Sequence, residues 1–408
     1  MSRFPVAVLA GGLATRLRPL TEKIPKILLD VAGKPFAVRQ LEVLRRHGVK
    51  RVVYCLGYLG EQVRATLGDG SAYGMELQYI FDGPTLLGTG GALRNALNLL
   101  DDSFLVLYGD SYLEIDYAAV EDAFSNSEHL GLMTVLRNSG RWDRSNVLLE
   151  NDRIICYDKT GGMPEMRHID FGLGALRARA FDNYPANSPI ELASIYQDLL
   201  ARNKLGCFEV NRRFYEIGSH SGLEETRRYV AGKETGRVVF LDRDGVINKV
   251  VMRDGKPCSP RSLREFELED GAKEAVQRLK DRGLTVIVVT NQPDIARGKM
   301  DWSDLDAMTQ RVYTELGVDD VRICPHDDRD GCTCRKPRPG MLLDGTRGDF
   351  PAAGFLVGDS WKDMEAGRAA GCLTVLIERS YNRGVTAEYL VHSLRDAVQL
   401  ILKKFERR

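Results

Sequence analysis

The stretch 238-VVFLDRDGVIN-248 places two carboxylates directly after a short apolar run. The run lacks the polar alternation of a half-exposed strand, so it predicts a buried strand of a parallel sheet. Side chains two positions apart on an extended backbone point the same way, and Asp242 and Asp244 can therefore share one site. Such a pair suits Mg²⁺-assisted phosphoryl transfer, in which one carboxylate attacks phosphorus and the other moves the proton. Taken alone, the pair is explained equally well by an ordinary turn at a strand end.

Three further pieces follow in chain order and favour the phosphoryl-transfer interpretation. The strong apolar run 285-TVIVVT-290 ends in a threonine, and Lys336 follows a cysteine-rich segment. The stretch 357-VGDSWKDMEAG-367 then supplies Asp359 and Asp363. A threonine hydroxyl and a lysine ammonium can hold a phosphoryl group, while further carboxylates complete a Mg²⁺ site.

The patterns D-x-D-G-V-I-N, T-N-Q-x-x-I-A-R-G and C-R-K-P resemble those of haloacid-dehalogenase-type phosphatases over residues 237–400. The resemblance implies that Asp242 is the nucleophile and Asp244 the general acid and base. It also assigns phosphate binding to Thr290 and Lys336, substrate binding to Asn291, Arg297 and Arg335, and Mg²⁺ binding to Asp242, the Asp244 carbonyl and Asp359. Asp363 is expected to support Asp359 or Lys336. Asp294 stands where the motif usually has a small residue.

The segment 324-CPHDDRDGCTCRKP-337 carries four soft metal ligands within eleven residues: Cys324, His326, Cys332 and Cys334. Three thiolates and one imidazole suit a closed, tetrahedral, structural Zn²⁺ site. Metal-free thiols and a redox site are alternatives, although the C-x-C spacing differs from the redox C-x-x-C. A zinc ion here would hold the loop that carries Arg335 and Lys336. Such a loop resembles those of heptose bisphosphate and histidinol-phosphate phosphatases.

The stretch 9-LAGGLATRLRPLTEKIPKILLDVAGKP-35 follows another short apolar run. Gly11 and Gly12 let backbone N–H groups approach phosphates closely. Arg16 and Lys26 supply positive charge where pyrophosphate would leave. A glycine-rich loop alone is weak evidence, and a phosphate-binding fold without catalysis is the alternative.

This stretch resembles the sugar-1-phosphate nucleotidyltransferase signature G-G-x-G-T-R-L-x-P-x-T followed by P-K, with similarity over residues 3–230. The resemblance implies in-line attack of a sugar-1-phosphate oxygen on the α-phosphorus of a nucleoside triphosphate. It assigns Mg²⁺ to Asp110 and Glu216, the sugar phosphate to Lys159, and the base and sugar to the loop with Gly88 and Gly90. Glu216 replaces the usual Asp, and Ala14 replaces a Gly, which would carry strain if that position needs a positive φ.

Apolar runs alternate with amphipathic segments along the whole chain, which predicts an α/β protein with mostly parallel sheets covered on both faces. Expected strands are 6–10, 52–56, 104–108, 238–241, 285–290 and 354–358, and expected helices include 36–48 and 271–283. The polar stretch 231-AGKETGR-237 predicts a linker. We therefore expect two Rossmann-like domains, 1–232 and 237–408, the first a nucleotidyltransferase domain and the second a phosphatase domain.

Composition excludes several classes of partner. The 408 residues carry 57 basic and 57 acidic side chains, so nothing indicates a nucleic-acid or membrane-surface partner. No apolar run approaches the ~18 residues that span a bilayer, and the N-terminus lacks signal-peptide features, so we expect a cytoplasmic protein. Eight cysteines do not make a disulfide-rich chain. A homo-oligomer is compatible with the sequence.

The two halves together suggest one pathway. Removal of the 7-phosphate of D-glycero-D-manno-heptose 1,7-bisphosphate gives a sugar 1-phosphate, which nucleotidyl transfer, with GTP as the first choice, converts to an NDP-heptose. The segments 155-ICYDKTGGMPEMRHIDFGLGAL-176 and 334-CRKPRPGMLL-343 look like the heptose enzymes. The alternative is a hexose-1-phosphate nucleotidyltransferase joined to a phosphatase for histidinol phosphate or another small phosphomonoester. The base, the anomer, the oligomeric state and channelling between sites are left open by the sequence.

Overall fold

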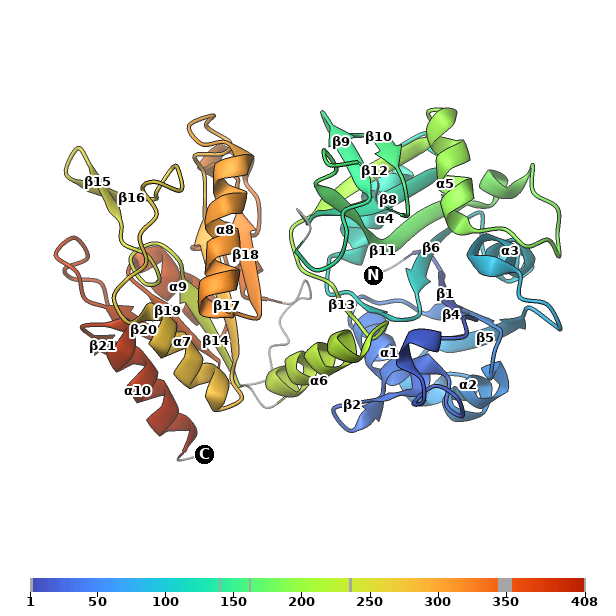
Figure 1. The fold of residues 1–408 in the computed structure, drawn as a ribbon, viewed down its shortest axis with the longest axis horizontal. Coiled ribbons are helices and arrows are strands. Elements are labelled where there is room, and N and C mark those ends of the chain that lie inside the picture. The colour runs from blue at the N-terminus through green and yellow to red at the C-terminus, as the bar shows by residue number, and fades with distance from the viewer. Residues whose placement is uncertain (1–2, 139–140, 161–162, 235–236, 344–353, 407–408) are drawn as a thin grey trace. The chain divides into compact units, whose positions relative to one another are not determined.

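The computed structural model describes residues 3–138, 141–160, 163–234, 237–343 and 354–406. The chain divides into two units, Met1–Arg227 and Arg228–Arg408, called unit 1 and unit 2 below (Figure 1). Helix α6 (His220–Glu234) runs through the division, so part of the predicted linker at 231–237 is helical. Alanine, lysine and glutamate are good helix formers, and the helix therefore continues past Gly232.

Unit 1 is built on a nine-stranded mixed sheet. Its parallel part comprises β1 (Val6–Ala10), β4 (Arg51–Leu56), β5 (Glu76–Phe81) and β6 (Ser103–Tyr108). Strand β11 (His168–Arg177) pairs antiparallel with β6 and with β8 (Gly131–Arg137), and the remaining strands are β9 (Val147–Glu150), β10 (Arg153–Tyr157) and β12 (Leu205–Val210). The register between β8 and β11 shifts between Asp170 and Gly174, so β11 is bulged there.

Helices and short strands complete unit 1. They are α1 (Phe36–Arg46), α2 (Gly60–Leu67), α3 (Gly88–Ala96), α4 (Tyr117–Ser125), α5 (Leu192–Ala201), β2 (Asp30–Val31), β3 (Lys34–Pro35), β7 (Ser111–Tyr112) and β13 (Tyr215–Glu216). Apolar side chains of α3 and α5 pack with strand residues in one buried cluster. The loops at the carboxyl ends of β1, β5 and β6 are thereby held on a rigid support.

Unit 2 contains a six-stranded, fully parallel sheet in the order β18-β17-β14-β19-β20-β21. The strands are β14 (Val238–Asp242), β17 (Thr285–Asn291), β18 (Asp320–Cys324), β19 (Phe355–Gly358), β20 (Leu373–Ile377) and β21 (Tyr389–Val391). A hairpin of β15 (Val251–Arg253) and β16 (Lys256–Cys258) follows the first strand. The predicted strands at 238–241, 285–290 and 354–358 are confirmed, within one or two residues at their ends.

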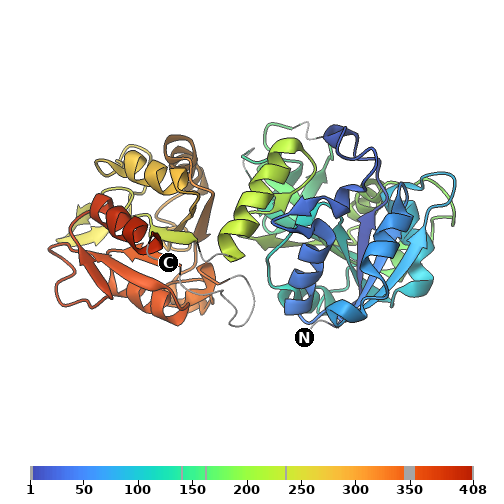
Figure 2. The same ribbon diagram turned by 90° about the horizontal axis from the view of Figure 1, so that it is seen from below.

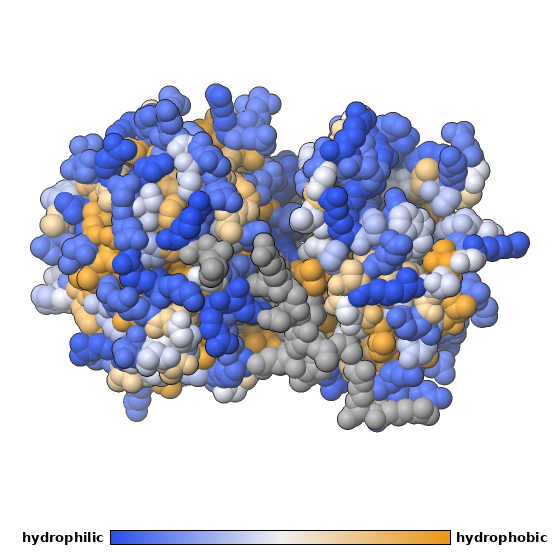
Figure 3. All heavy atoms as spheres, turned by 180° about the vertical axis from the view of Figure 1, so that it is seen from behind, coloured by the Kyte–Doolittle hydropathy of each residue, from blue (hydrophilic) through white to orange (hydrophobic). Residues whose placement is uncertain are grey.

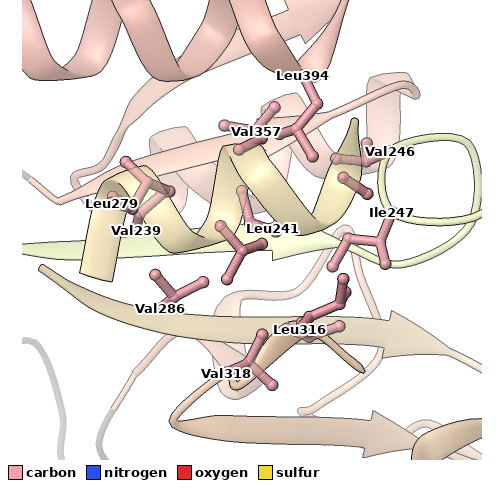
Figure 4. Close-up of a cluster of buried hydrophobic side chains, with 14 of the residues drawn as sticks. Val239, Leu241, Val246, Ile247, Leu279, Val286, Leu316, Val318, Val357 and Leu394 are labelled. Carbon is pink, nitrogen blue, oxygen red and sulfur yellow. The ribbon is translucent and has the colours of Figure 1, made fainter. Parts of the chain in front are cut away.

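Helices cover both faces of the unit 2 sheet (Figure 2). They are α7 (Ala272–Asp281), α8 (Trp302–Leu316), α9 (Trp361–Ala369) and α10 (Leu394–Phe405). Val239 and Leu241 point to the face where Leu279 of α7 and Leu394 of α10 are buried with them (Figure 4). Helix α9 packs on the other face, where Gly367 comes so close that an added Cβ would lie 2.6 Å from the Thr374 methyl group. The apolar runs that predicted parallel strands are therefore buried from both sides.

In the described part of the chain, no helix is long and apolar enough to cross a bilayer. On the face shown in Figure 3, hydrophobic residues are scattered among hydrophilic ones.

Candidate active sites

A cavity of about 1060 Å³ opens at the carboxyl ends of the unit 2 strands. Most of the side chains that the sequence singles out line it: Asp242, Asp244, Thr290, Asn291, Arg297, Arg335, Lys336 and Asp359. They come from the ends of β14, β17 and β19 and from the loop after β18. Ligand sites in open parallel sheets lie at this edge.

Lys336 is the centre of the charged floor of this cavity. Its ammonium nitrogen lies 2.7 Å from Asp242 Oδ1 and 2.6 Å from Asp363 Oδ1, and it donates to the Val289 carbonyl at 3.1 Å. The Lys336 side chain is 3% exposed and that of Asp363 is fully buried. The carboxylates raise the pKa of Lys336 although burial opposes this, so the lysine is charged. Asp363 thus supports Lys336, one of the two roles expected for it.

Three buried carboxylates, Asp242, Asp359 and Asp363, present oxygens within 4.8 Å of one another. Burial, and after it the Asp363 charge, raises the pKa of Asp242 well above its usual range. The same two causes raise the pKa of Asp359 to about 7. One ammonium cannot neutralise three carboxylates, so the cluster has the charge and the oxygen donors that suit a divalent cation. Gly245, with φ of 85°, leaves room for the Asp359 carboxylate in this cluster, because an added Cβ would lie 2.0 Å from Asp359 Oδ2.

Asp244 has a different environment from Asp242. Its carboxylate accepts hydrogen bonds from five side chains: Arg243, Asn248, Ser259, Thr290 and Gln292. Burial works against ionisation, but the fully buried Arg243 guanidinium and these donors lower the pKa of Asp244. The pKa values of the two aspartates of the D-x-D pair are therefore shifted in opposite directions. The sequence analysis missed Arg243, Ser259 and Gln292, although Arg243 and Gln292 lie inside the two quoted motifs.

Asn291 is predicted to bind substrate, but its side chain holds the Lys336 backbone. The amide nitrogen donates to the Lys336 carbonyl at 3.0 Å, and the amide oxygen accepts the Lys336 N–H at 3.1 Å. The strand β17 therefore positions the lysine loop directly. Contact of Asn291 with a substrate stays a prediction.

Arginines link the segments that surround this cavity. Arg297 pairs with Asp327 at 2.5 Å, and Arg335 pairs with Asp328 at 2.7 Å and donates to the His326 carbonyl. Asp294, which departs from the usual motif, pairs with Arg261 at 2.6 Å. Its carboxylate thus ties the segment after the β15–β16 hairpin to the loop after β17.

The four predicted soft ligands lie together beside this cavity. The Cys334 sulfur is 3.3 Å from the Cys324 sulfur, 3.5 Å from the Cys332 sulfur and 3.3 Å from His326 Nδ1. Cys324 Sγ is 3.7 Å from Cys332 Sγ and 3.6 Å from His326 Nδ1. Ligands of a tetrahedral zinc, with Zn–S bonds of about 2.3 Å, are separated by about 3.8 Å. The four atoms therefore already have nearly the spacing of a metal-binding tetrahedron.

Unit 1 contains a second cavity, of about 770 Å³, at the carboxyl ends of β1, β5 and β6. The predicted residues that line it are Gly11, Gly12, Arg16, Lys26, Gly88, Asp110, Lys159 and Glu216. Gly90 is not among the residues that line it, and contact of Gly90 with a ligand stays a prediction. Its N–H donates to the Ile190 carbonyl at 2.8 Å, and an added Cβ would lie 2.9 Å from an Ile195 methyl group. Gly90 lets α3 pack closely on the segment before α5.

Positive and negative side chains lie close together at the unit 1 cavity. Lys26 Nζ lies 2.6 Å from Asp110 Oδ2. Burial and the nearby Asp110 charge raise the pKa of Glu216, which the Arg16 guanidinium partly offsets. The side chains of Arg16 and Glu216 both approach Gly218. A Cβ added to Gly218 would lie 3.1 Å from Arg16 Nη2 and 2.6 Å from Glu216 Oε2. The longer carboxylate at 216 therefore still reaches the group formed by Arg16, Lys26 and Asp110.

Ala14, in the phosphate loop, has φ of 48° and ψ of 42°. This left-handed conformation favours glycine and costs a non-glycine residue about 1–2 kcal/mol. The position thus needs the backbone for which the usual motif supplies glycine. The Thr21 hydroxyl donates to the Ala14 carbonyl at 2.8 Å and holds the strained turn.

Two aspartates on the cavity wall were missed by the sequence analysis. Asp82 follows β5, its Oδ2 accepts the Leu87 N–H at 3.2 Å, and burial raises its pKa. Burial also raises the pKa of Asp170 to about 6. Asp82 could have been predicted as Asp110 was, because it is a carboxylate that follows an apolar strand. Asp170 could not, because the bulge in β11 brings it to the cavity.

Comparison with known proteins assigns each unit. The sequence model of the nucleotidyl transferase family matches residues 6–141, and that of the haloacid dehalogenase-like hydrolases matches residues 175–371. An N-acetylmuramate alpha-1-phosphate uridylyltransferase of Neisseria meningitidis is 33% identical over 224 residues, which cover 54% of this chain and 95% of the relative. A D-glycero-beta-D-manno-heptose-1,7-bisphosphate 7-phosphatase of Bordetella bronchiseptica is 36% identical over 159 residues, which cover 37% of this chain and 86% of the relative.

A solved structure supports the fold of unit 1. A Bacillus anthracis protein assigned as a glucose-1-phosphate thymidylyltransferase superposes with a TM-score of 0.51 at 21% identity, over 56% of this chain and 95% of the other. The predicted Rossmann-like folds and both predicted enzyme classes are confirmed by these matches. The chain belongs to the nucleotidyl transferase family in its first unit and to the haloacid dehalogenase-like hydrolase family in its second.

Proposed function

We propose that the chain carries out two consecutive steps of NDP-heptose synthesis. Unit 2 removes the 7-phosphate of D-glycero-D-manno-heptose 1,7-bisphosphate. Unit 1 transfers a nucleotidyl group, GMP from GTP, to the resulting heptose 1-phosphate and releases pyrophosphate. The observation that carries this proposal is the similarity of unit 2 to a heptose bisphosphate phosphatase in a chain whose other unit is a nucleotidyl transferase. The product of the first reaction is the class of substrate that the second consumes.

In unit 2, an Asp242 oxygen attacks the 7-phosphorus, and the bond from phosphorus to the sugar oxygen breaks. Lys336 and Thr290 bind the phosphoryl oxygens, and Asp244 delivers a proton to the leaving sugar oxygen. Asp244 then takes a proton from water, which attacks the aspartyl phosphate and releases orthophosphate. The lowered pKa of Asp244 suits its second role, and a monoanionic phosphate ester can bring the proton that the first role requires.

Mg²⁺ in unit 2 would be held by Asp242, the Asp244 carbonyl and Asp359. The three clustered carboxylates and the raised pKa values of Asp242 and Asp359 support a cation at this place. Bound there, Mg²⁺ neutralises charge on the phosphate and keeps the nucleophile ionised. Asp363 holds Lys336 against Asp242, and Asn291 fixes the backbone of the same lysine.

The cluster of Cys324, His326, Cys332 and Cys334 would hold a structural Zn²⁺. Four protein ligands leave no open position, so the ion would supply rigidity and not chemistry. The loop that it closes continues directly into Arg335 and Lys336. Their fixed positions allow Lys336 to meet Asp242 in a buried site.

In unit 1, the backbone of Gly11 and Gly12 and the side chains of Arg16 and Lys26 would hold the triphosphate. Asp110 and Glu216 would bind Mg²⁺, which lowers the charge repulsion between the two phosphates. Lys26, now paired with Asp110, can turn to the departing pyrophosphate once that carboxylate has another partner. Lys159 would hold the sugar phosphate; it pairs at present with Glu191 at 3.4 Å.

Asp82 supports guanine as the base. It lines the cavity beside Gly11 of the phosphate loop, where an added Cβ would be 3.5 Å from Asp82 Oδ2. A carboxylate accepts both neighbouring donors, N1–H and N2–H, of guanine. Uracil offers one donor between two acceptors, which would face the carboxylate unfavourably. The uridylyltransferase relative makes UTP the competing candidate.

The test uses the purified full chain with Mg²⁺, each anomer of the bisphosphate, and GTP, UTP, ATP and CTP in turn. Orthophosphate and one NDP-heptose, identified by mass, are the expected products. The Asp242→Asn variant should lose orthophosphate release by a factor on the order of 10⁴ or more and retain nucleotidyl transfer to supplied heptose 1-phosphate. Release of orthophosphate from histidinol phosphate, with hexose 1-phosphates as the better acceptors, would replace the proposal with its alternative.

A further inference from the structure

Besides Tyr381, whose hydroxyl donates to Asp359, the aromatic residue that lines the unit 2 cavity is Trp361. It is the first residue of α9 and is 49% exposed. Only Ser360, which caps the helix, separates it from Asp359. The Cα atoms of Trp361 and Asp359 are therefore at most about 7.6 Å apart. The tryptophan thus lines the same cavity as Asp242 and Lys336, where a phosphate would be held.

The cavity that Trp361 lines has apolar residues among its many charged ones. Val250, Pro257, Pro293 and Val385 line the same cavity. The Lys362 ammonium, which also lines the cavity, lies 5.8 Å from the indole centroid. The cavity thus offers charged groups that suit a phosphate and, at Trp361, an aromatic side chain with a cation near it. A sugar phosphate has this division, with an anionic end and a ring whose C–H bonds form an apolar face.

We propose that Trp361 stacks on the carbon skeleton of the sugar and selects ring-containing phosphate esters in unit 2. This inference rests on the proposed function of unit 2 and adds a residue that reads the sugar. The electron-rich indole face attracts the slightly positive C–H groups of a sugar, and the contact removes apolar surface from water. Because the phosphoryl group is held separately, the contact acts on binding of the ester and not on attack at phosphorus.

The first experiment compares two substrates on three variants. The substrates are D-glycero-D-manno-heptose 1,7-bisphosphate and acetyl phosphate, which has no ring. In Trp361→Ala, the ratio of kcat/KM for the sugar to kcat/KM for acetyl phosphate should fall about tenfold, mainly through KM for the sugar. Trp361→Phe should retain the ratio within about threefold, since phenylalanine keeps an aromatic face. Leu390→Ala removes an equally exposed apolar side chain outside the cavity and should leave the ratio unchanged.

An unchanged ratio in Trp361→Ala, with the wild-type chain active on the sugar, would overturn the proposal and leave the function of unit 2 intact. A wild-type chain that hydrolyses acetyl phosphate but not the sugar bisphosphate would overturn both. The two failures are therefore distinguishable.

Fluorescence gives a second readout that does not depend on turnover. The chain has three tryptophans, and the Asp242→Asn variant with Mg²⁺ should bind the bisphosphate without cleaving it. Its fluorescence should change on binding, and the change should be lost in Asp242→Asn/Trp361→Phe. In a Trp142→Phe background, which removes the tryptophan of unit 1, a change of equal size from GTP in the absence of the sugar that is lost with Trp361→Phe would show that the indole stacks on a base, and would overturn the proposal. A sugar-induced change that persists without Trp361 would do the same.

Discussion

Replacing Lys336 with methionine should destabilise unit 2 strongly and in a pH-dependent way. The ammonium lies 2.7 Å from Asp242 and 2.6 Å from Asp363, with its side chain 3% exposed. Each contact corresponds to about 6 kcal/mol of Coulomb energy at an effective dielectric constant of about 20, before the cost of burying the charges. Breaking a buried pair by removing one partner typically costs about 3–5 kcal/mol. We expect a loss of that size in the free energy of unfolding at pH 8 without Mg²⁺.

The loss should shrink as the pH falls. Without the lysine, three carboxylates lie within 4.8 Å of one another, and the pKa values of Asp242 and Asp359, which are already raised, must rise further. A carboxyl group whose pKa is raised by folding stabilises the fold at low pH and loses that contribution as the pH rises. Uptake of one extra proton by the folded variant changes its deficit by about 1.4 kcal/mol per pH unit. The deficit at pH 6 should therefore be about 2–3 kcal/mol smaller than at pH 8, and saturating Mg²⁺ should reduce the deficit at pH 8.

The measurement is equilibrium urea unfolding, followed by tryptophan fluorescence in a Trp142→Phe background. The remaining tryptophans, Trp302 and Trp361, both lie in unit 2, and Trp302 packs against its buried core. Lys403→Met makes the same chemical change at an exposed position of α10 and should stay within about 0.5 kcal/mol of the parent. A loss below about 1 kcal/mol for Lys336→Met at pH 8, or an equal loss at pH 6, would refute the electrostatic account.

Three more predictions follow from the two sites. Without Mg²⁺, the raised pKa of Asp359, about 7, should make unit 2 less stable as the pH rises from about 4 to 7, and Asp359→Asn should flatten the urea midpoint over this range. Purified protein should contain about one zinc per chain by mass spectrometry, and Cys332→Ser should lose the metal together with most phosphatase activity, because the Lys336 loop is released; full activity of a metal-free chain would contradict this. Asp82→Asn should lower kcat/KM for GTP about 10²-fold and raise the ratio for UTP over GTP, since the amide offers guanine one acceptor in place of two; an unaltered ratio would exclude Asp82 as the base-reading group.

Much of the site could be predicted because strand ends carry it. Asp110, Asp242 and Thr290 each end or follow an apolar strand, and the carboxyl ends of neighbouring parallel strands meet at one edge. The cysteine-rich loop was predictable from ligand type and spacing alone. The close packing at Gly90 could not be predicted, because the sequence does not distinguish a glycine that permits helix packing from one that contacts a ligand. Part of the predicted linker is helical, because polar residues that suggest a loop are also good helix formers.

Two α/β units, and the identity of the groups that meet at the sheet edges, could be predicted from the sequence, because these depend on local periodicity and on short motifs. Only the tertiary structure decided the electrostatic state of those groups. Asp242 and Asp244 are two residues apart, yet folding raises the pKa of the first and lowers that of the second. Both carboxylates are buried, but Asp242 lies beside the negative charge of Asp363, whereas Asp244 is surrounded by Arg243 and four other hydrogen-bond donors. Burial strengthens such interactions, so neighbours brought together by the fold, and not neighbours in the chain, set the chemistry of each residue.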